Sequence, residues 1–169
     1  MVSSSISGVS RAPRLRNGSK KRVLPKSRKT PQPSSAEARR RMQSTRQTGT
    51  SCELALRSAL RAKGLRFRVD WPIPGTRRRA DIVFIRARVV IFVDGCFWHA
   101  CPHHATWPKN NAAWWRAKID GNVERDRSTD KYLRESGWTV VRFWEHAASR
   151  AAARRIEVTL LNQAARLQA

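Results

Sequence analysis

Residues 80–99 read ADIVFIRARVVIFVDGCFWH, and this stretch decides the fold that the sequence predicts. It holds two short apolar runs rich in β-branched residues, Ala80 to Ile85 and Arg88 to Val93, separated by only two residues. Runs of this length and composition predict two central strands. Asp81 lies near the start of the first run, and Asp94 directly follows the second. The two predicted strands therefore carry carboxylates near their ends.

The segments on either side predict helices and two further strands. Upstream, the patterns predict a helix that is capped by Thr50 or Ser51 and runs to about Lys63, and a half-buried strand from Leu65 to Asp70. Downstream, they predict a helix over residues 111–136, a strand over residues 138–144 and a final helix from residue 148 to about residue 167. The order α-β-β-β-α-β-α predicts an α/β fold, with a mixed sheet flanked by helices.

The first 47 residues differ in composition from the rest. They are rich in Ser, Pro, Arg and Lys, with 13 Lys or Arg residues and one acid, Glu37. Such a segment cannot bury enough apolar surface to offset the entropy lost on ordering, so we predict a disordered basic arm over residues 1–47. Residues 48–147 then form the folded domain. Residues 148–169 form a C-terminal helix packed on the domain or trailing it.

The whole chain is strongly basic, with 35 Lys and Arg against 12 Asp and Glu and a net charge of +23. This charge predicts a polyanionic partner, first of all nucleic acid, although a solubilising surface would look the same. The three cysteines argue against a disulfide framework and for a reducing compartment, the cytoplasm. The longest apolar run, Val89 to Val93, is far shorter than a membrane span, so we expect no membrane association.

Asp81 and Asp94 suit a Mg²⁺ site, because carboxylates are hard oxygen ligands and the ion can polarise a phosphodiester. An isolated Asp at a strand end more often bonds turn amides. The pair, on the second and third strands after a helix, is the pattern of the restriction-endonuclease-like nucleases. Those commonly have lysine two residues after the second acid, where this chain has Cys96. His99 is the nearest replacement as a general base, or alternatively a metal ligand with its neighbours.

Thiol and imidazole side chains are concentrated between Cys96 and His104. Thiolate and imidazole ligands so close in sequence favour tetrahedral zinc. Cys96 and Cys101 would be two ligands, His103 or His104 the third, and His146 the fourth. The alternative is that the cysteines are buried free thiols. A structural zinc would pin this loop to the end of the last strand.

Phe97 and Trp98 are adjacent in this loop. A regular strand would place them on opposite faces and could not easily bury both. Beside a nuclease centre they could wedge between base pairs and open the duplex. The alternative is that they cap the core.

These motifs together resemble the very-short-patch repair (Vsr) DNA mismatch endonucleases, over about Met42 to Ala147. The matching stretches are Pro74-Gly75, Arg79-Ala80-Asp81, Val89 to Val93, Gly95 to His99, Asn122 to Arg127, Gly137-Trp138, Val140-Val141 and Trp144-Glu145. The resemblance implies a restriction-endonuclease-like fold. It also implies that the enzyme nicks one strand of double-stranded DNA, 5′ of the thymine in a T·G mismatch left when 5-methylcytosine deaminates.

Carried over position by position, the resemblance implies that Mg²⁺ is bound by Asp81 with help from the backbone carbonyl of Val93. His99 would be the general base, and Asp126 would orient it. Glu53 matches a further active-site acid, although it could instead be an exposed partner of Arg57. The implied DNA contacts are an intercalating wedge of Phe97, Trp98 and Met42; we also expect phosphate contacts from Arg77, Arg78 and Arg79.

The chain departs from the family pattern at three positions. Asp94 stands where many relatives have histidine, which leaves its role open, and an acid there could recruit a second metal ion. Cys101 occupies a place where histidine occurs elsewhere, and His146 a place where cysteine does, so the type of zinc ligand is kept. The resemblance favours His104 over His103 as the third ligand.

Two other functions fit the same residues. One is a restriction-type endonuclease that cuts both strands, and the other is a zinc-stabilised DNA-binding module without catalysis, which the missing lysine favours. We expect a monomer, since a single-strand nick needs one active site. We expect it to act in the bacterial cytoplasm at the nucleoid, with mismatch repair proteins as further partners.

Overall fold

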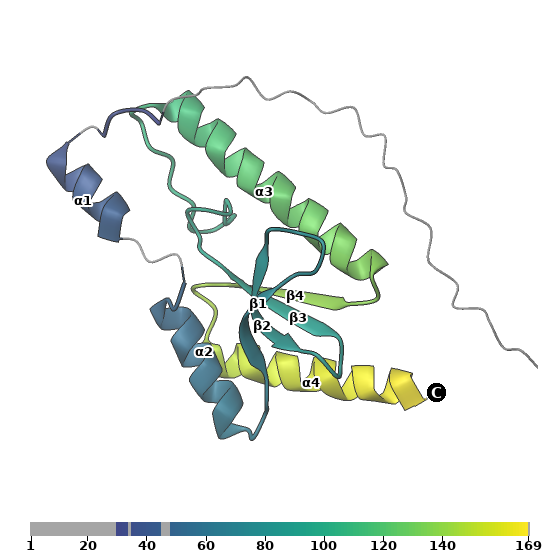
Figure 1. The fold of residues 1–169 in the computed structure, drawn as a ribbon. Helices are drawn as coiled ribbons and strands as arrows, with labels where there is room; N and C mark the ends of the chain where they lie inside the picture. The colour runs from purple at the N-terminus through teal and green to yellow at the C-terminus, as the bar shows by residue number, and fades with distance from the viewer. Residues whose placement is uncertain (1–29, 34, 45–47, 169) are drawn as a thin grey trace, which may run out of the picture. The chain divides into compact units, whose positions relative to one another are not determined.

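The computed structural model describes residues 30–33, 35–44 and 48–168. The chain divides into two units, Met1–Thr30 and Pro31–Ala169, and the helices and strands of the described residues all belong to the second (Figure 1). These elements are α1 (Ala36–Ser44), α2 (Ser51–Ala62), β1 (Arg68–Pro72), β2 (Arg79–Phe84), β3 (Val89–Asp94), α3 (Ala112–Glu135), β4 (Thr139–Trp144) and α4 (Ser149–Gln168).

Helix α1 corrects part of the predicted basic arm. Its sequence, AEARRRMQS, consists mainly of residues with high helix propensity. The prediction of disorder gave more weight to the low hydropathy of the segment than to this propensity. The remainder of the predicted disordered arm, residues 1–29, 34 and 45–47, lies outside the described residues.

The four strands form one sheet in the order β1-β2-β3-β4. The pairs β1/β2 and β2/β3 are antiparallel, whereas β3 and β4 are parallel and are joined through α3. The predicted mixed α/β sheet flanked by helices is confirmed.

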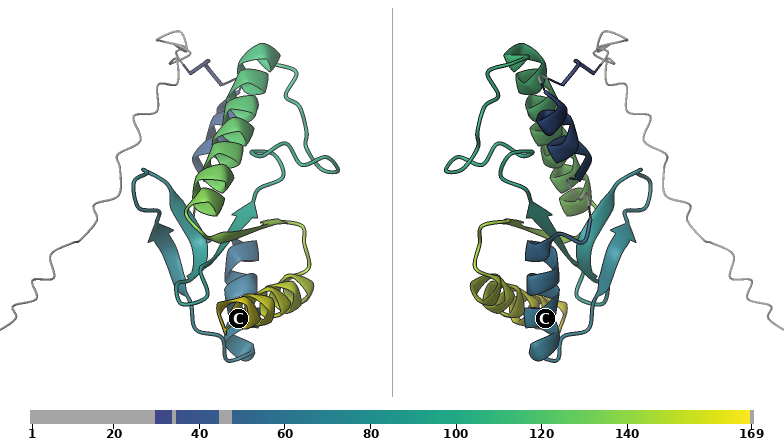
Figure 2. Two further views of the ribbon diagram at one scale, coloured as in Figure 1. Left: turned by 90° about the vertical axis from the view of Figure 1, so that its right-hand side faces the viewer. Right: turned by 90° about the vertical axis from the view of Figure 1, so that its left-hand side faces the viewer.

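Helices cover both faces of the sheet (Figures 1 and 2). On one face, Leu56 and Leu60 of α2 and Ile156 of α4 pack with buried residues of β2, β3 and β4. On the other face, Leu133 of α3 packs with apolar residues that include Val90 of β3. Strand β3 is thus covered on both sides, which explains its unbroken apolar sequence.

The strand predicted from Leu65 begins later, at Arg68. The Leu65 amide donates to the Leu60 carbonyl and the Gly64 amide to the Arg61 carbonyl, with Gly64 at φ +71°, so the end of α2 is a Schellman cap. The backbone amide of Leu65, which the alternating pattern had assigned to the strand, therefore belongs to this cap. Strand pairing therefore starts only at Arg68.

Strands β2 and β3 separate at the end that carries the acids. Their paired residues run from Phe84 with Val89 to Ile82 with Ile91. Beyond that point, the Val93 amide donates to Oδ2 of Asp81 at 2.7 Å. The Asp81 side chain therefore lies between the diverging strands.

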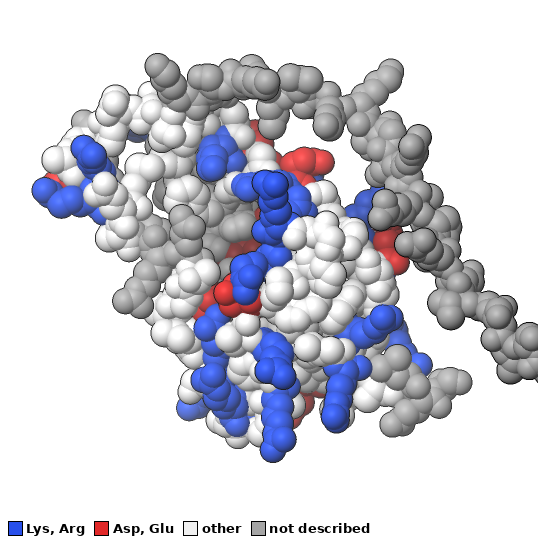
Figure 3. All heavy atoms as spheres, viewed as in Figure 1, with Lys and Arg blue, Asp and Glu red and all other residues white. Residues whose placement is uncertain are grey.

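The surface agrees with the charge of the sequence. Lys and Arg side chains spread over much of the face in Figure 3, and Asp and Glu form smaller patches between them. Among the helices that the structure describes, none is long and apolar enough to span a membrane.

Candidate active site

A histidine and two aspartates meet where β3 ends. His99 lies in the loop after β3, and its Nδ1 is 2.5 Å from Oδ2 of Asp126 on α3. The same nitrogen lies 3.8 Å from Oδ1 of Asp94, the last residue of β3. The structure therefore brings His99 together with Asp126, as the resemblance implied, and places Asp94 beside them.

The charges of this group are coupled. Burial alone would lower the pKa of His99, but the hydrogen bond to Asp126 and the charges of Asp94 and Asp126 outweigh it and raise the pKa. Burial would raise the pKa of Asp126, but His99 and Arg142 lower it overall. The geometry thus favours an ionised Asp126 next to a histidine that holds its proton more firmly than usual.

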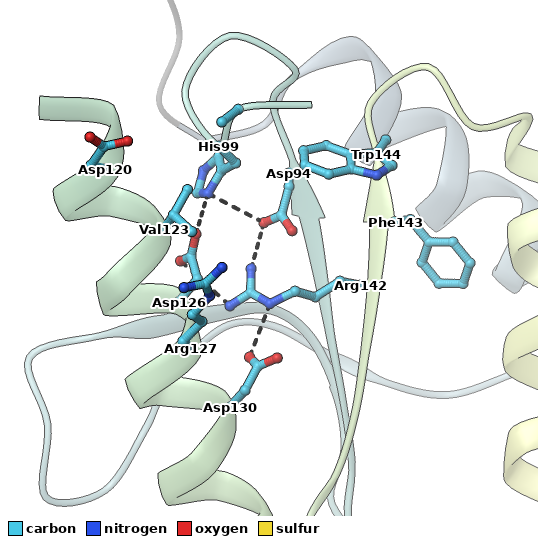
Figure 4. Close-up of a pocket in the computed structure, with 11 residues that line it drawn as sticks. Asp94, His99, Asp120, Val123, Asp126, Arg127, Asp130, Arg142, Phe143 and Trp144 are labelled. Carbon is cyan, nitrogen blue, oxygen red and sulfur yellow. Dashed lines mark hydrogen bonds and ion pairs between the residues drawn. The ribbon is translucent and has the colours of Figure 1, made fainter. Parts of the chain in front are cut away.

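These side chains line a pocket of about 440 Å³ (Figure 4). One wall is α3, with Asp120, Val123, Asp126, Arg127 and Asp130, and the facing wall is formed by Asp94, His99, Ala100, Arg142, Phe143 and Trp144. Burial raises the pKa of Asp94 despite the opposing effect of Arg142. The pocket is therefore rich in carboxylates although the chain is basic.

Asp81 lies one strand away from this group, between the ends of β2 and β3. Burial, together with the charges of Glu53 and Asp94, raises the pKa of Asp81 to about 6, against the lowering effect of the Val93 amide and Arg57. Asp81 and Val93, the residues expected to hold Mg²⁺, are thus adjacent. The contact between them is a hydrogen bond that the Val93 amide donates to Asp81, whereas the expected metal ligand is the Val93 carbonyl.

Glu53 is buried, not exposed. It accepts hydrogen bonds from the Gly49 amide, from the Thr50 hydroxyl and from Arg57, whose Nη2 lies 2.9 Å from Oε2 of Glu53. Only 4% of Glu53 is exposed. The structure therefore has both the predicted Arg57 partner and an acid turned inward near Asp81.

The predicted zinc ligands form one cluster. Ligand atoms of Cys96, Cys101, His104 and His146 all lie within 4.8 Å of one another. His103 is exposed and lies outside this group, which contains His104 instead. All three cysteines of the chain are free.

Phe97 and Trp98 are half-buried in an aromatic cluster with Trp115 of α3. The ring centroids of Phe97 and Trp115 are 5.3 Å apart, and those of Trp98 and Trp115 are 5.9 Å apart. The Trp98 carbonyl accepts a hydrogen bond from Asn122 at 2.9 Å. Met42, the third predicted wedge residue, is 41% exposed on α1.

The three adjacent arginines have different surroundings. Arg78 donates to the hydroxyls of Thr129 and Ser128, and Arg79 pairs with Asp70. Arg77 is exposed. Of the three arginines expected to contact phosphate, Arg78 and Arg79 thus have protein partners for some of their donors.

Sequence reasoning missed Arg142, Asp130 and Trp115. Arg142 is the charged residue in the otherwise apolar strand β4, TVVRFW, and it shares a sheet face with the acids. Asp130 lies one helical turn after Asp126. These spacings could have indicated that Arg142 and Asp130 lie near the other acids. Only the packing of α3 on the sheet shows which residues are in contact.

A His–Asp pair can act as a general base, and the strongly basic chain suits a nucleic acid partner, so the pocket is compatible with hydrolysis of a nucleic acid phosphodiester. Comparison with known proteins is more specific. The family model described as DNA mismatch endonuclease Vsr matches residues 34–106.

Curated relatives agree with this match. The type II nicking enzyme V.NaeI of Lentzea aerocolonigenes is 45% identical over 119 residues, which cover 69% of this chain and 72% of that protein. The DNA mismatch endonuclease Vsr of Escherichia coli (strain K12) is 44% identical over 103 residues, 58% of this chain and 62% of that protein. The chain therefore belongs to the Vsr DNA mismatch endonuclease family, a family of DNA endonucleases.

Proposed function

We propose that this protein is a Mg²⁺-dependent endonuclease that nicks one DNA strand 5′ of the thymine in a T·G mismatch arising from deaminated 5-methylcytosine. Family membership supports mismatch-directed cleavage, and the names of relatives, which describe nicking, favour one cut strand over two. The observation that carries the proposal is the His99–Asp126 pair, 2.5 Å apart, in the loop that also carries Phe97 and Trp98.

His99 acts as the general base in this proposal. The Nδ1–H of His99 donates a hydrogen bond to the Asp126 carboxylate and keeps its proton, which leaves Nε2 as the atom that accepts a proton from the attacking water. Ionised Asp126 fixes this tautomer and stabilises the imidazolium that forms. The missing lysine of related nucleases is thereby replaced by a histidine with a carboxylate partner.

Asp81 and the carbonyl of Val93 would hold Mg²⁺, with Glu53 nearby. Burial and neighbouring negative charge make the ionised form of Asp81 costly, and a bound cation would offset that cost, so the residues fit the ion. When bound, the ion supplies Lewis-acid stabilisation of the scissile phosphate.

Cys96, Cys101, His104 and His146 would hold a structural zinc ion. Tetrahedral bonds of about 2.0 to 2.3 Å place neighbouring ligand atoms about 3.3 to 3.8 Å apart. The observed separations include 3.1 Å from Cys96 Sγ to His146 Nδ1 and 3.8 Å from Cys101 Sγ to His104 Nδ1. The donor set fits zinc, which would fix the loop that carries His99.

The mismatched duplex would be opened by Phe97 and Trp98, with Met42 as a further wedge residue. Their partial burial leaves part of each ring available, while contacts with Trp115 hold the rings in place. Within its loop, exposed Arg77 would contact a DNA phosphate. We propose a monomer that works in the bacterial cytoplasm, with mismatch repair proteins as further partners.

The test is a paired nicking assay with the full chain, Zn²⁺ and Mg²⁺, on a T·G duplex and its T·A twin. We expect a nick only in the T·G duplex, on the thymine strand, and loss of nicking with retained DNA binding in Asp81→Ala. Equal cleavage of both duplexes would favour a restriction-type enzyme, and binding without any cleavage would favour the non-catalytic module.

A further inference from the structure

Arg142 joins the acids of the pocket. From β4, its Nη1 donates to Oδ1 of Asp94 at 2.6 Å, and its Nε donates to Oδ1 of Asp130 at 3.0 Å. Its Nη2 lies 3.5 Å from Oδ1 of Asp126. Figure 4 shows the guanidinium between carboxylates that come from β3 and α3.

The guanidinium is held firmly in this position. Its central carbon lies 4.4 Å from the centroid of the Phe92 ring, and only 21% of the side chain is exposed. A planar guanidinium presents donors in fixed directions, so one Arg can serve several carboxylates that a flexible ammonium could not bridge equally well. Arg142 is therefore a permanent positive charge among the three acids.

The same place would otherwise suit a divalent cation. Ligand atoms of Asp94, His99 and Asp126 lie within 4.8 Å of one another, and carboxylates and imidazole are common metal ligands. However, Oδ1 of Asp94 already bonds Arg142, and Nδ1 of His99 already bonds Asp126. A divalent ion here would displace these bonds and lie beside a positive charge.

We propose that Arg142 takes the place of a second metal ion: it neutralises Asp94, positions Asp126 for its bond to His99, and excludes divalent cations from the Asp94–His99–Asp126 group. The positioning part rests on the proposed function of the His99–Asp126 pair. The exclusion part does not, because metal binding is measured without DNA.

The exclusion is tested by calorimetric titration of Mn²⁺ into the full, zinc-loaded chain at about pH 8, where free carboxylates are ionised. All variants carry Asp81→Asn, which removes the proposed catalytic metal site but keeps an oxygen for the Val93 amide. We expect this parent to bind Mn²⁺ weakly, and Arg142→Gln to bind one ion at least about tenfold more tightly. Further addition of Asp94→Asn abolishes the gain.

Two variants control for charge and for nonspecific effects. Arg142→Lys keeps the positive charge and gains little Mn²⁺ affinity. Arg134→Gln removes an exposed arginine that pairs with the same Asp130, at 3.3 Å, and changes nothing. If Arg142→Gln does not fold alone, because three acids lose their common partner, Mn²⁺ restores its circular dichroism spectrum.

The proposal is overturned if Arg142→Gln gains no Mn²⁺ affinity and no Mn²⁺-dependent folding. It is equally overturned if the Asp81→Asn parent already binds an ion that Asp94→Asn removes. For positioning, Arg142→Gln with Asp81 intact lowers kcat at least about tenfold with little change in KM, and Arg142→Lys restores part of it. If the unaltered chain does not nick T·G DNA, the proposed function fails and the Mn²⁺ result still decides cation exclusion.

Discussion

The Nδ1 atom of His99 lies 2.5 Å from Oδ2 of Asp126, although 27 residues separate the two in the chain. This contact fixes which imidazole nitrogen carries the proton and which is left to act as a base. It also ties the loop after β3 to α3. The contact therefore links the fold to the proposed chemistry.

Asp126→Asn is expected to lower the nicking rate by about two orders of magnitude, the usual scale for impaired general base catalysis. The base must be neutral, so activity rises as pH rises through the pKa of His99. Asp126 helps to raise that pKa, and removing its charge lowers it. The acid limb of the kcat profile therefore moves to lower pH.

The exposed Asp120, also on the pocket wall of α3, provides the comparison for Asp126. Asp120→Asn is expected to move the acid limb much less. A limb that stays in place in Asp126→Asn would show that His99 is not the group that titrates in the profile.

Asp81→Asn is expected to abolish nicking while stabilising the metal-free fold at neutral pH. The pKa of Asp81 is about 6 in the folded chain, against about 4 when unfolded. Because the folded chain holds this proton more tightly than the unfolded chain, the free energy of unfolding falls as pH rises from about 4 to about 6. The substitution should recover up to about 3 kcal/mol at about pH 7.5 and little at about pH 4.

Urea unfolding of the zinc-loaded chain without added Mg²⁺ measures this difference. Added Mg²⁺ should stabilise the unaltered chain and not Asp81→Asn. A substitution that is destabilising at both pH values would contradict the assigned cost of the buried carboxylate.

Zinc removal is expected to unfold the loop after β3 and to stop nicking. We expect one zinc ion per chain by elemental analysis, and Cys101→Ser to lose the ion and lower Tm. His103→Ala is the matched control, because His103 adjoins His104 but lies outside the ligand cluster. A zinc-free chain of undiminished stability would refute the structural zinc.

Trp98→Ala is expected to weaken binding to the T·G duplex more than to the T·A duplex. Stacking of an aromatic side chain on a base contributes about 1 to 3 kcal/mol, so the loss of affinity should be about 5-fold to about 150-fold. Trp107→Ala provides the control, since Trp107 is 40% exposed and stacks with Arg116. Fluorescence titration of both duplexes measures the difference, and equal losses on the two duplexes would argue against a wedge.

Much of the fold was predictable because local patterns determine it. The apolar runs Ala80 to Ile85 and Arg88 to Val93 predicted β2 and β3 to within one residue at each end, and α3 was predicted from residue 111 to residue 136. The start of β1 was wrong because the alternation from Leu65 was interpreted as a strand, whereas the Leu65 amide completes the Schellman cap of α2. Helix α1 was missed because composition was weighed above helix propensity.

The sequence by itself determined the strands, the helices and the candidate ligands, including Asp81, His99 and the Cys/His cluster, because spacing and residue chemistry are local properties. Only the tertiary structure decided the partners of Arg142 and the role open to Asp94. Arg142 and Asp94 are 48 residues apart, and they meet because parallel pairing of β3 with β4 places them on one face beneath α3. The pairing of charged side chains depends on how distant segments pack, so it cannot be predicted from a local sequence pattern.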